Sequence, residues 1–515
     1  MIGDFIMKKN AKFIIVFIIS TIIILLFTLY EAKLIKPISW QLIFLTIIVT
    51  LIVALMSFSI YKEKNFTEDK AFKFVIPLIC IMFFVAMPMF RNHDEDTHWL
   101  RIYDIANGNL FVPTEYGEIF QEGATNYPAT EIPKAVFDIV DREKTAGHNF
   151  KELYEYTINE DETIIVALPT EALYSPIQYI PQVTGTLIAK MFTNRPIVMA
   201  YMARLFNMIT TIIILYFAMK LIPFGKKIFL AVMAIPIAVE GFTSLSSDAM
   251  TISIAMLLIA YIFNIIFNKD KKIVTWKDKV ILGTLCVIIA LCKIVYLPLV
   301  GLLLLLPKEK FSSKTNKIVT VIIIIAIATI INLAWLYISS QYLAEYKEGR
   351  PVEQVQKLLT NPIEYLQTVF HSINLNGNKY LMSMFGGELG LNEHVILNTV
   401  IPYTFMFLCL ILGIIDNDIK NKLSKFQNCI IILIILAITA LIFTSLYIQW
   451  TPTESTSIAG IQGRYFLPIL PLAILLMGNL KIKANYKEET IVKFMSITIL
   501  LTQINVILSI LSRNI

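Results

Sequence analysis

The segment RNHDEDTHWLR at residues 91–101 places three adjacent carboxylates, two imidazoles and two guanidinium groups within eleven residues. It directly follows the apolar run 71–90. Ionisable groups are expensive at membrane depth, so charge at the end of an apolar run usually indicates a polar site. If the segment is helical, Asp94, His98 and Arg101 fall on one face. The pattern predicts a helix that lies flat at the membrane surface and turns these side chains to one side.

The composition is that of a membrane protein. Hydrophobic residues make up 57% of the chain and charged residues only 16%. Apolar runs of about 20 residues recur, which is enough to cross the ~30 Å hydrocarbon core. The net charge of +6 lies mostly in short loops, where it indicates orientation rather than a nucleic-acid partner. We therefore predict an all-α polytopic membrane protein.

Hydropathy predicts about 13 transmembrane helices. Two of them, 278–292 and 294–306, are short, and we expect them to form a hairpin whose tip lies on the outer side near 293–298. The expected spans are 13–30, 40–60, 71–90, 197–222, 227–243, 247–268, 278–292, 294–306, 316–338, 395–415, 428–448, 461–479 and 490–511.

The basic loops predict the orientation. All of them can lie in the cytoplasm, as positive charge prefers, if the N-terminus is cytoplasmic and the stretch 176–192 does not cross the membrane. Two prolines and two glutamines in its first half favour a surface helix there. Residue usage rich in Lys and Ile and poor in Gly suggests a bacterial plasma membrane. We divide the chain into an N-terminal transmembrane hairpin (1–70), a core (71–338) that includes the outer loop 91–196, a second outer loop (339–394) and C-terminal helices (395–515).

Acidic and basic groups gather on the expected outer face. Carboxylates can deprotonate a hydroxyl or hold a divalent cation, and cations can hold a lipid phosphate at the membrane surface. Both needs arise in sugar transfer from a polyprenyl-phosphate carrier. The candidate catalytic residues are Asp94, Glu95 and Asp248, which could also hold Mg²⁺ or Mn²⁺. The candidate substrate-binding residues are His98, Arg101, Tyr174, Arg204, Lys293, Arg464 and Tyr465.

Each candidate also has a simpler interpretation. Aspartate is a favoured N-cap residue, which would account for Asp94 and Asp248 without chemistry. Long basic side chains reach lipid headgroups, and polar residues form hydrogen bonds at the interface. This interpretation fits Lys293 least, because a charge within an apolar stretch costs ~2.5–3.5 kcal/mol to insert and usually has a partner. The residues that this interfacial interpretation could explain are His98, Arg101, Arg204, Lys293 and Arg464.

The order of the motifs resembles that of GT-C glycosyltransferases, nearest to the aminoarabinose-transferase and protein O-mannosyltransferase branch. There an Asp-Glu pair, an amphipathic helix, a glycine and a proline follow one another, as they do in 94–113 here. This chain departs from the branch in having no lysine before Pro176 and no Thr or Gly around Lys293. The resemblance covers roughly 80–480, and its other segments are 174–179, 203–205, 243–252, 291–298 and 464–468.

A closer resemblance is to a bacterial membrane-protein family catalogued as a domain of unknown function (DUF2142), which itself looks GT-C-like. That family has Asp-Glu-x-x-His, a later Phe-Gly-x-x-Gly and then Gln-Gly-Arg-Tyr. The corresponding segments here are 94–98, 385–390 (one residue longer) and 462–465. We expect the loop that contains 385–390 to close over the site.

These resemblances imply sugar transfer from a polyprenyl-phosphate donor to an envelope polysaccharide, teichoic acid or glycolipid, with inversion at the anomeric carbon. Asp94 would be the general base, and Glu95 and Asp248 would orient it or a metal. The alternatives are a transporter or flippase for lipid-linked sugars, which would favour internal repeats with broken helices, and a non-catalytic partner in wall assembly. The residues expected to hold the departing lipid phosphate are Lys293, Arg464 and Arg204.

Overall fold

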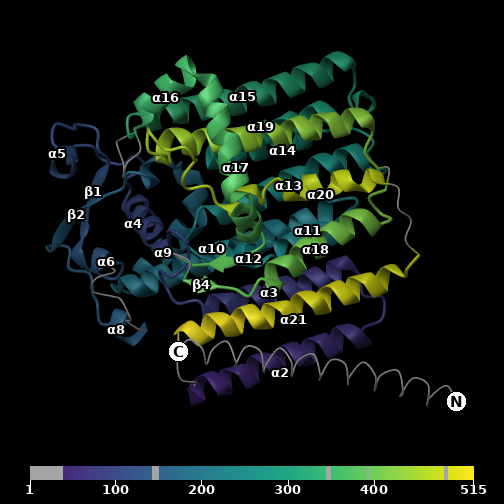
Figure 1. The fold of residues 1–515 in the computed structure, drawn as a ribbon, viewed down its shortest axis with the longest axis horizontal. Coiled ribbons are helices and arrows are strands. Elements are labelled where there is room, and N and C mark those ends of the chain that lie inside the picture. Colours follow the sequence, from purple (N-terminus) through teal and green to yellow (C-terminus); the bar gives the residue numbers. More distant parts are fainter. Residues whose placement is uncertain are drawn as a thin grey trace.

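The computed structural model describes residues 39–141, 150–343, 350–390, 394–420, 422–480 and 485–514. These residues form a mostly α-helical bundle with a smaller layer at one end (Figure 1). The expected first span, 13–30, lies outside the described residues.

Six helices of the described residues are long and apolar enough to cross a membrane. They run along the length of the bundle (Figure 1). Some of their exposed side chains are large and apolar, such as Phe44, Ile330 and Leu436. A helix satisfies its own backbone hydrogen bonds, which hydrocarbon requires of any segment that crosses it. These six candidate spans coincide with expected ones: α2 (Trp40–Lys62), α10 (Pro196–Leu221), α13 (Asp248–Phe267), α15 (Lys314–Ser340), α19 (Lys425–Trp450) and α21 (Glu488–Asn514).

A proline interrupts one expected span. The stretch 227–243 is divided into α11 (Lys226–Met233) and α12 (Pro236–Phe242). Ile235 is extended between them, because the residue before a proline avoids the α conformation. The prediction of one continuous helix here was wrong.

The expected hairpin at Lys293 is confirmed. Helix α14 (Trp276–Cys292) ends there, Lys293 is extended, and η3 (Ile294–Leu305) runs back against α14. The returning segment is a 3₁₀-helix, which rises about 2.0 Å per residue instead of 1.5 Å. Its twelve residues therefore reach farther than an α-helix of the same length would.

Three more expected spans have altered bounds. The stretch 461–479 is divided into short helices, with Pro468 between the first two and Pro471 near the start of the second. Proline has no backbone N–H with which to continue the hydrogen bonding of a helix. The span at 395–415 begins late because 395–396 form a strand. The elements are α3 (Glu68–Ala86), α18 (Val400–Ile415), η5 (Gly463–Phe466), α20 (Leu470–Leu476) and η6 (Met477–Leu480).

The described residues between 95 and 190 cover one end of the bundle and are named here the cap layer (Figure 1). The layer has its own apolar core, in which Trp99, Ile132 and Val136 are buried. Its antiparallel strands, together with the short pair β3 (Glu388–Leu389) and β4 (Val395–Ile396), correct the expectation of an all-α fold. The cap elements are α4 (Glu95–Ala106), α5 (Gly117–Phe120), β1 (Ala129–Pro133), α6 (Lys134–Asp138), α8 (Phe150–Tyr154), β2 (Thr163–Ala167), η1 (Glu171–Leu173), η2 (Pro176–Tyr179) and α9 (Ile180–Lys190).

Helix α4 differs from the expected surface helix. Its polar and apolar residues alike are buried, including Trp99, Arg101 and Tyr103. The rest of the cap layer covers the helix, so the expected polar side is buried within the protein. Helix α9 has only eleven residues, which is too short to cross a membrane, as expected for 176–192.

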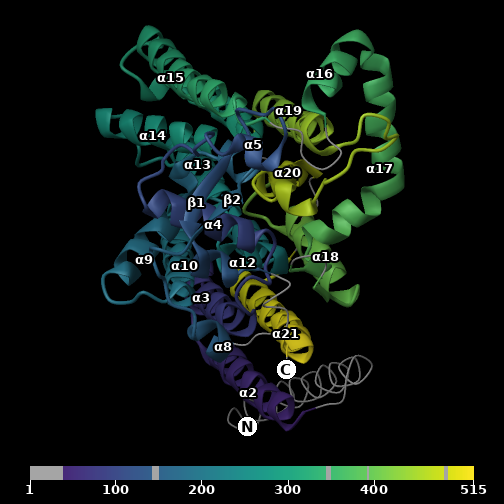
Figure 2. The same cartoon turned by 90° about the vertical axis from the view of Figure 1, so that its left-hand side faces the viewer.

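The second expected loop is largely helical. Figure 2 shows α16 (Pro351–Thr360) and α17 (Pro362–Met384) as an arm along one side of the bundle. The arm joins the bundle through η5, where the Gly463 amide donates to Ser383 Oγ (3.0 Å). A Cβ at Gly463 would overlap the backbone of Tyr380 and Met384. Glycine at this position therefore lets two backbones approach closely.

We predict that Gly463→Ala separates α17 from η5 and lowers the unfolding temperature of the detergent-solubilised protein. The matched control is Gly283→Ala in α14, where an added Cβ meets no atom within 4 Å. Alanine is preferred over glycine in a helix by about 1 kcal/mol, so the control should be neutral or stabilising. Equal unfolding temperatures for the two variants would show that the close approach at Gly463 is not required.

Candidate active site

The turn that leads into α4 has an unusual backbone. Phe90 (φ 63°) and Asp94 (φ 54°) both adopt the left-handed conformation. Aspartate tolerates this conformation, but a bulky residue such as phenylalanine rarely does, so surrounding contacts must hold the turn. Asp94 is the N-cap residue of α4, yet its side chain makes no capping hydrogen bond. The simpler interpretation of Asp94 as a cap is therefore wrong, and its carboxylate points elsewhere.

Glu95 and Arg204 form a fully buried ion pair that holds this turn. Glu95 Oε1 accepts from Arg204 Nε (2.8 Å) and from the amide of Leu245 (3.0 Å). Glu95 Oε2 accepts from Arg204 Nη2 (2.6 Å), the amide of Phe90 (2.9 Å) and Asn92 Nδ2 (3.1 Å). Arg204 was predicted to hold the lipid phosphate and Glu95 to orient the base or a metal, but the polar atoms of both are engaged with the protein. The structure gives them a positioning role, and Arg204 does not reach the surface.

Four charged side chains meet beside this pair. Arg464 Nη2 contacts Asp94 Oδ2 (2.5 Å), and Arg464 Nε lies 3.3 Å from Asp248 Oδ2. Lys293 Nζ contacts Asp248 Oδ1 (2.6 Å). Asp248 is the first residue of α13 and Lys293 is the reversal between α14 and η3, so residues far apart in sequence form one chain of ion pairs. A partner was expected for Lys293, and it is Asp248. The four side chains of Asp94, Asp248, Lys293 and Arg464 are named here the ion cluster.

Exposure differs sharply within the ion cluster. The side chains of Asp248, Lys293 and Arg464 are 10–14% exposed, whereas that of Asp94 is 45% exposed. Burial raises the pKa of Asp94, but the positive charge of Arg464, followed by His98, lowers it to about 2. Asp94 is therefore an ionised carboxylate at the accessible end of the cluster at neutral pH.

Aromatic rings surround the cations. Lys293 Nζ lies 5.4 Å from the ring centroid of Tyr174 and 5.2 Å from that of Tyr465, and Arg464 lies 5.6 Å from the Tyr465 ring. The predicted residue Tyr174 also stacks on His98, whose Nδ1 is 2.7 Å from the hydroxyl of Tyr179. Cation–π contacts favour the charged forms of Lys293 and Arg464 in this buried setting.

Arg101 does not join the ion cluster. Its guanidinium contacts Asp104 (2.5 Å) and donates to the carbonyls of Asn109 (2.9 Å) and Leu110 (2.6 Å), and it is fully buried in the cap layer. The shared helical face expected for residues 94, 98 and 101 does not form, because Asp94 precedes the helix in a left-handed conformation.

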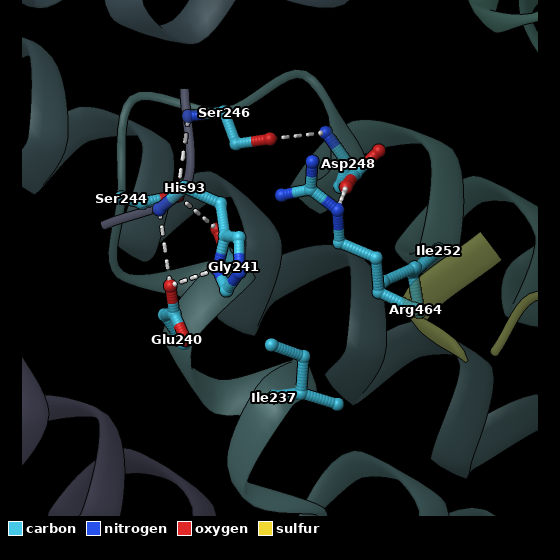
Figure 3. Close-up of a pocket in the computed structure, with 9 residues that line it drawn as sticks. All are labelled: His93, Ile237, Glu240, Gly241, Ser244, Ser246, Asp248, Ile252 and Arg464. Atoms are coloured by element: carbon cyan, nitrogen blue, oxygen red, sulfur yellow. Dashed lines mark hydrogen bonds and ion pairs between the residues drawn. The ribbon is translucent and has the colours of Figure 1, made fainter. Parts of the chain in front are cut away.

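A small pocket lies beside the ion cluster. Figure 3 shows Arg464 and Asp248 on one side and His93 with Glu240 on the other. Glu240 Oε1 accepts from the amide of His93 (3.2 Å) and lies 2.8 Å from its Nδ1, and Glu240 also accepts from the amide of Gly390. The sequence reasoning missed His93 and Glu240. Glu240 could have been found from its place inside the apolar stretch 227–243, because an ionisable residue within a membrane segment usually has a function.

Two glycines explain how the 385–390 segment reaches this pocket. Gly386 (φ +83°) and Gly390 (φ +76°) adopt the left-handed conformation that glycine favours. A Cβ at Gly390 would lie 2.7 Å from the carbonyl oxygen of Arg91. The segment therefore packs directly against the turn that precedes Asp94.

The contacts do not fit the divalent-cation site that Asp94, Glu95 and Asp248 could form. Asp94 and Asp248 face Arg464 and Lys293, while both oxygens of Glu95 are bonded to other groups. Among the described residues, no three His, Cys, Asp or Glu side chains are grouped to hold a metal. We therefore assign no step to a metal.

The three segments 94–98, 385–390 and 462–465 thus meet at one place. A family profile described as "Predicted membrane protein (DUF2142)" matches residues 74–473. The chain belongs to this family. The matched region of the DUF2142 protein contains the whole ion cluster and the Glu95–Arg204 pair. No curated protein and no solved structure matched the chain.

We predict that Glu95→Gln strongly destabilises the protein. Removing one partner of a buried ion pair leaves the other charge uncompensated, at a cost of about 3–5 kcal/mol. Thermal unfolding in detergent would measure the loss. Glu63→Gln is the control, because Glu63 pairs with Lys70 while 43% exposed and such pairs contribute little. A Glu95 variant as stable as the Glu63 variant would contradict the positioning role.

We also predict an acid-dependent loss of stability that involves His98. Burial lowers the pKa of His98 from 6.5 to about 4, although Asp94 opposes the shift. As the pH falls, His98 binds a proton in the unfolded chain before it does so in the folded protein. Its contribution to the free energy of unfolding is therefore fully present above pH 6.5 and is lost as the pH decreases towards 4. Unfolding temperatures at pH 7 and pH 5 should differ less in His98→Gln than in the wild type. The exposed His371→Gln is the control, and an unchanged pH dependence in the His98 variant would refute the assignment.

Proposed function

We propose that this DUF2142 protein is a GT-C-type inverting glycosyltransferase. It would move a sugar from a polyprenyl-phosphate donor to an envelope polysaccharide, teichoic acid or glycolipid. One observation carries the proposal: an accessible carboxylate, Asp94, contacts the buried Arg464, which shares Asp248 with Lys293 where a candidate membrane span begins. The first group can accept a proton, and the other two can neutralise a lipid phosphate.

The proposed architecture has about 13 spans, a cytoplasmic N-terminus and the cap layer on the extracellular side of a bacterial plasma membrane. The basic loops 269–279 and 308–317 support this orientation. Helix α13 starts at the ion cluster and ends at Phe267, so the loop after it lies at the end of the bundle away from the cap layer. Positive charge prefers the cytoplasmic side.

In the proposed reaction the acceptor hydroxyl attacks the anomeric carbon of the donor sugar. Asp94 takes the hydroxyl proton as the new carbon–oxygen bond forms on the face opposite the phosphate. The bond between the anomeric carbon and the phosphate oxygen breaks, and its electron pair leaves with polyprenyl phosphate. Lys293 and Arg464 offset the negative charge that develops on that oxygen.

The neighbouring residues would support this step without taking part in it. Tyr174 and Tyr465 hold the two cations over their rings, and the Tyr296 hydroxyl donates to the carbonyl of Tyr465 (2.8 Å). The Glu95–Arg204 pair would fix the position of Asp94.

A transporter or flippase for lipid-linked sugars is the second candidate. The break between α11 and α12 favours it, because discontinuous helices are common in transporters. At the break the carbonyl of Ala234 accepts a hydrogen bond from Gln503 of α21 (2.6 Å). Such a protein would not need a proton acceptor at position 94.

We predict that Asp94→Asn removes sugar transfer while the protein remains in the membrane. General base catalysis contributes about 10²- to 10⁴-fold, and asparagine tolerates the left-handed backbone of Asp94 but cannot accept the proton. The measurement compares envelope glycans of the variant, the wild type and a deletion strain. Asp138→Asn in the cap layer is the control for the loss of one negative charge. Normal glycans in the Asp94 variant, with altered glycans in the deletion, would favour transport or scaffolding instead.

A further inference from the structure

Among the residues that the structure describes, Arg464 is the one charged side chain in contact with the Asp94 carboxylate. Arg464 Nη2 is 2.5 Å from Asp94 Oδ2, and within the described residues no other side chain hydrogen-bonds to this carboxylate. Asp94 does not cap α4, so no local hydrogen bond holds its side chain. Asp248, by contrast, contacts Lys293 through one oxygen and Arg464 through the other. Arg464 can therefore release Asp94 without leaving Asp248 unpaired.

The charges of the ion cluster cancel. Asp94 and Asp248 are negative, and Arg464 and Lys293 are positive, so an anionic ligand that enters must displace a carboxylate or leave the cluster with excess negative charge. Asp94 is the member that can move at least cost, because it is 45% exposed while the others are 10–14% exposed. A carboxylate that turns towards water regains its hydration, whereas a buried one does not.

We propose that Asp94 occupies the place of the donor phosphate on Arg464, and that phosphate binding displaces Asp94 and releases it as the base. The inference rests on the proposed function for the role of the base, but the exchange itself concerns only the binding of a lipid phosphate. The sugar-bearing donor is a phosphodiester with one negative charge, which matches the single charge that Asp94 withdraws.

The exchange links binding to reactivity. While it is paired with Arg464, Asp94 has a pKa of about 2 and is a weak proton acceptor. Removing that positive contact raises its basicity, so the base becomes effective when the donor phosphate is in place. The transferred proton then balances the second negative charge of the departing phosphate monoester, and the total charge of the site does not change during the step.

The test measures binding of polyprenyl phosphate to the full-length protein in nanodiscs, with uncharged polyprenol as the second ligand. Asp94→Asn should bind the phosphate about tenfold more tightly than the wild type, because the competing carboxylate is gone. Asp94→Gly should behave in the same way, since glycine also adopts the left-handed backbone. Asp138→Asn, which also removes one negative charge from the cap layer, should leave the affinity unchanged, and polyprenol should bind all four proteins equally.

Each outcome is decisive for the exchange. Unchanged or weaker phosphate binding in both Asp94 variants would overturn it, and so would an equal gain in Asp138→Asn, which would indicate a general charge effect. A gain for polyprenol would show that the lipid chain, not the phosphate, is recognised. Sugar transfer by the wild type is measured separately, so tighter phosphate binding by the Asp94 variants together with no transfer by the wild type would retain the exchange and reject the transferase.

Discussion

The arrangement of the site depends on the buried contact between Glu95 and Arg204. Burying two charges is costly, and the cost is offset only where further hydrogen bonds satisfy them. Here the carboxylate accepts from the guanidinium, two backbone amides and a side-chain amide. Two of these donors belong to the turn before α4, and a third, the Leu245 amide, lies three residues before Asp248. One carboxylate therefore fixes the two segments that carry Asp94 and Asp248.

The second constraint is electrostatic. In a weakly polar interior, an unpaired charge is costly and charges of opposite sign attract strongly. The four members of the ion cluster satisfy one another, and the rings of Tyr174 and Tyr465 complete the surroundings of the cations. This arrangement is better suited to binding an anion than to binding a metal ion, because each carboxylate already faces a cation.

Sequence patterns predicted much of this site and misassigned the rest for physical reasons. The free-energy cost of inserting Lys293 within an apolar stretch correctly indicated that it has a partner. The order of the motifs correctly selected Asp94, Asp248 and Arg464 as members of one site. Helical periodicity failed for Arg101, because the left-handed backbone at Asp94 breaks the spacing. The pairing of Glu95 with Arg204 could not be predicted, because contacts between residues far apart in sequence leave no local sequence pattern. Long apolar helices were predictable, whereas the break at Pro236 and the 3₁₀ geometry after Lys293 depend on residues that hydropathy does not weigh.

The opposite end of the bundle is held by a comparable device. Lys227, 3% exposed, contacts Asp416, Glu68 and Glu488, which come from the region after α18, from α3 and from α21. In a membrane the apolar surfaces of helices gain little by leaving lipid for one another, so such polar contacts help to specify which helices pack together. The two ends differ in one respect that matters for function. Lys227 joins bundle helices or their ends, whereas Arg464 reaches a half-exposed carboxylate on a turn. An ion pair of the first kind fixes the packing of the bundle, and one of the second kind can exchange its partner while the bundle stays intact.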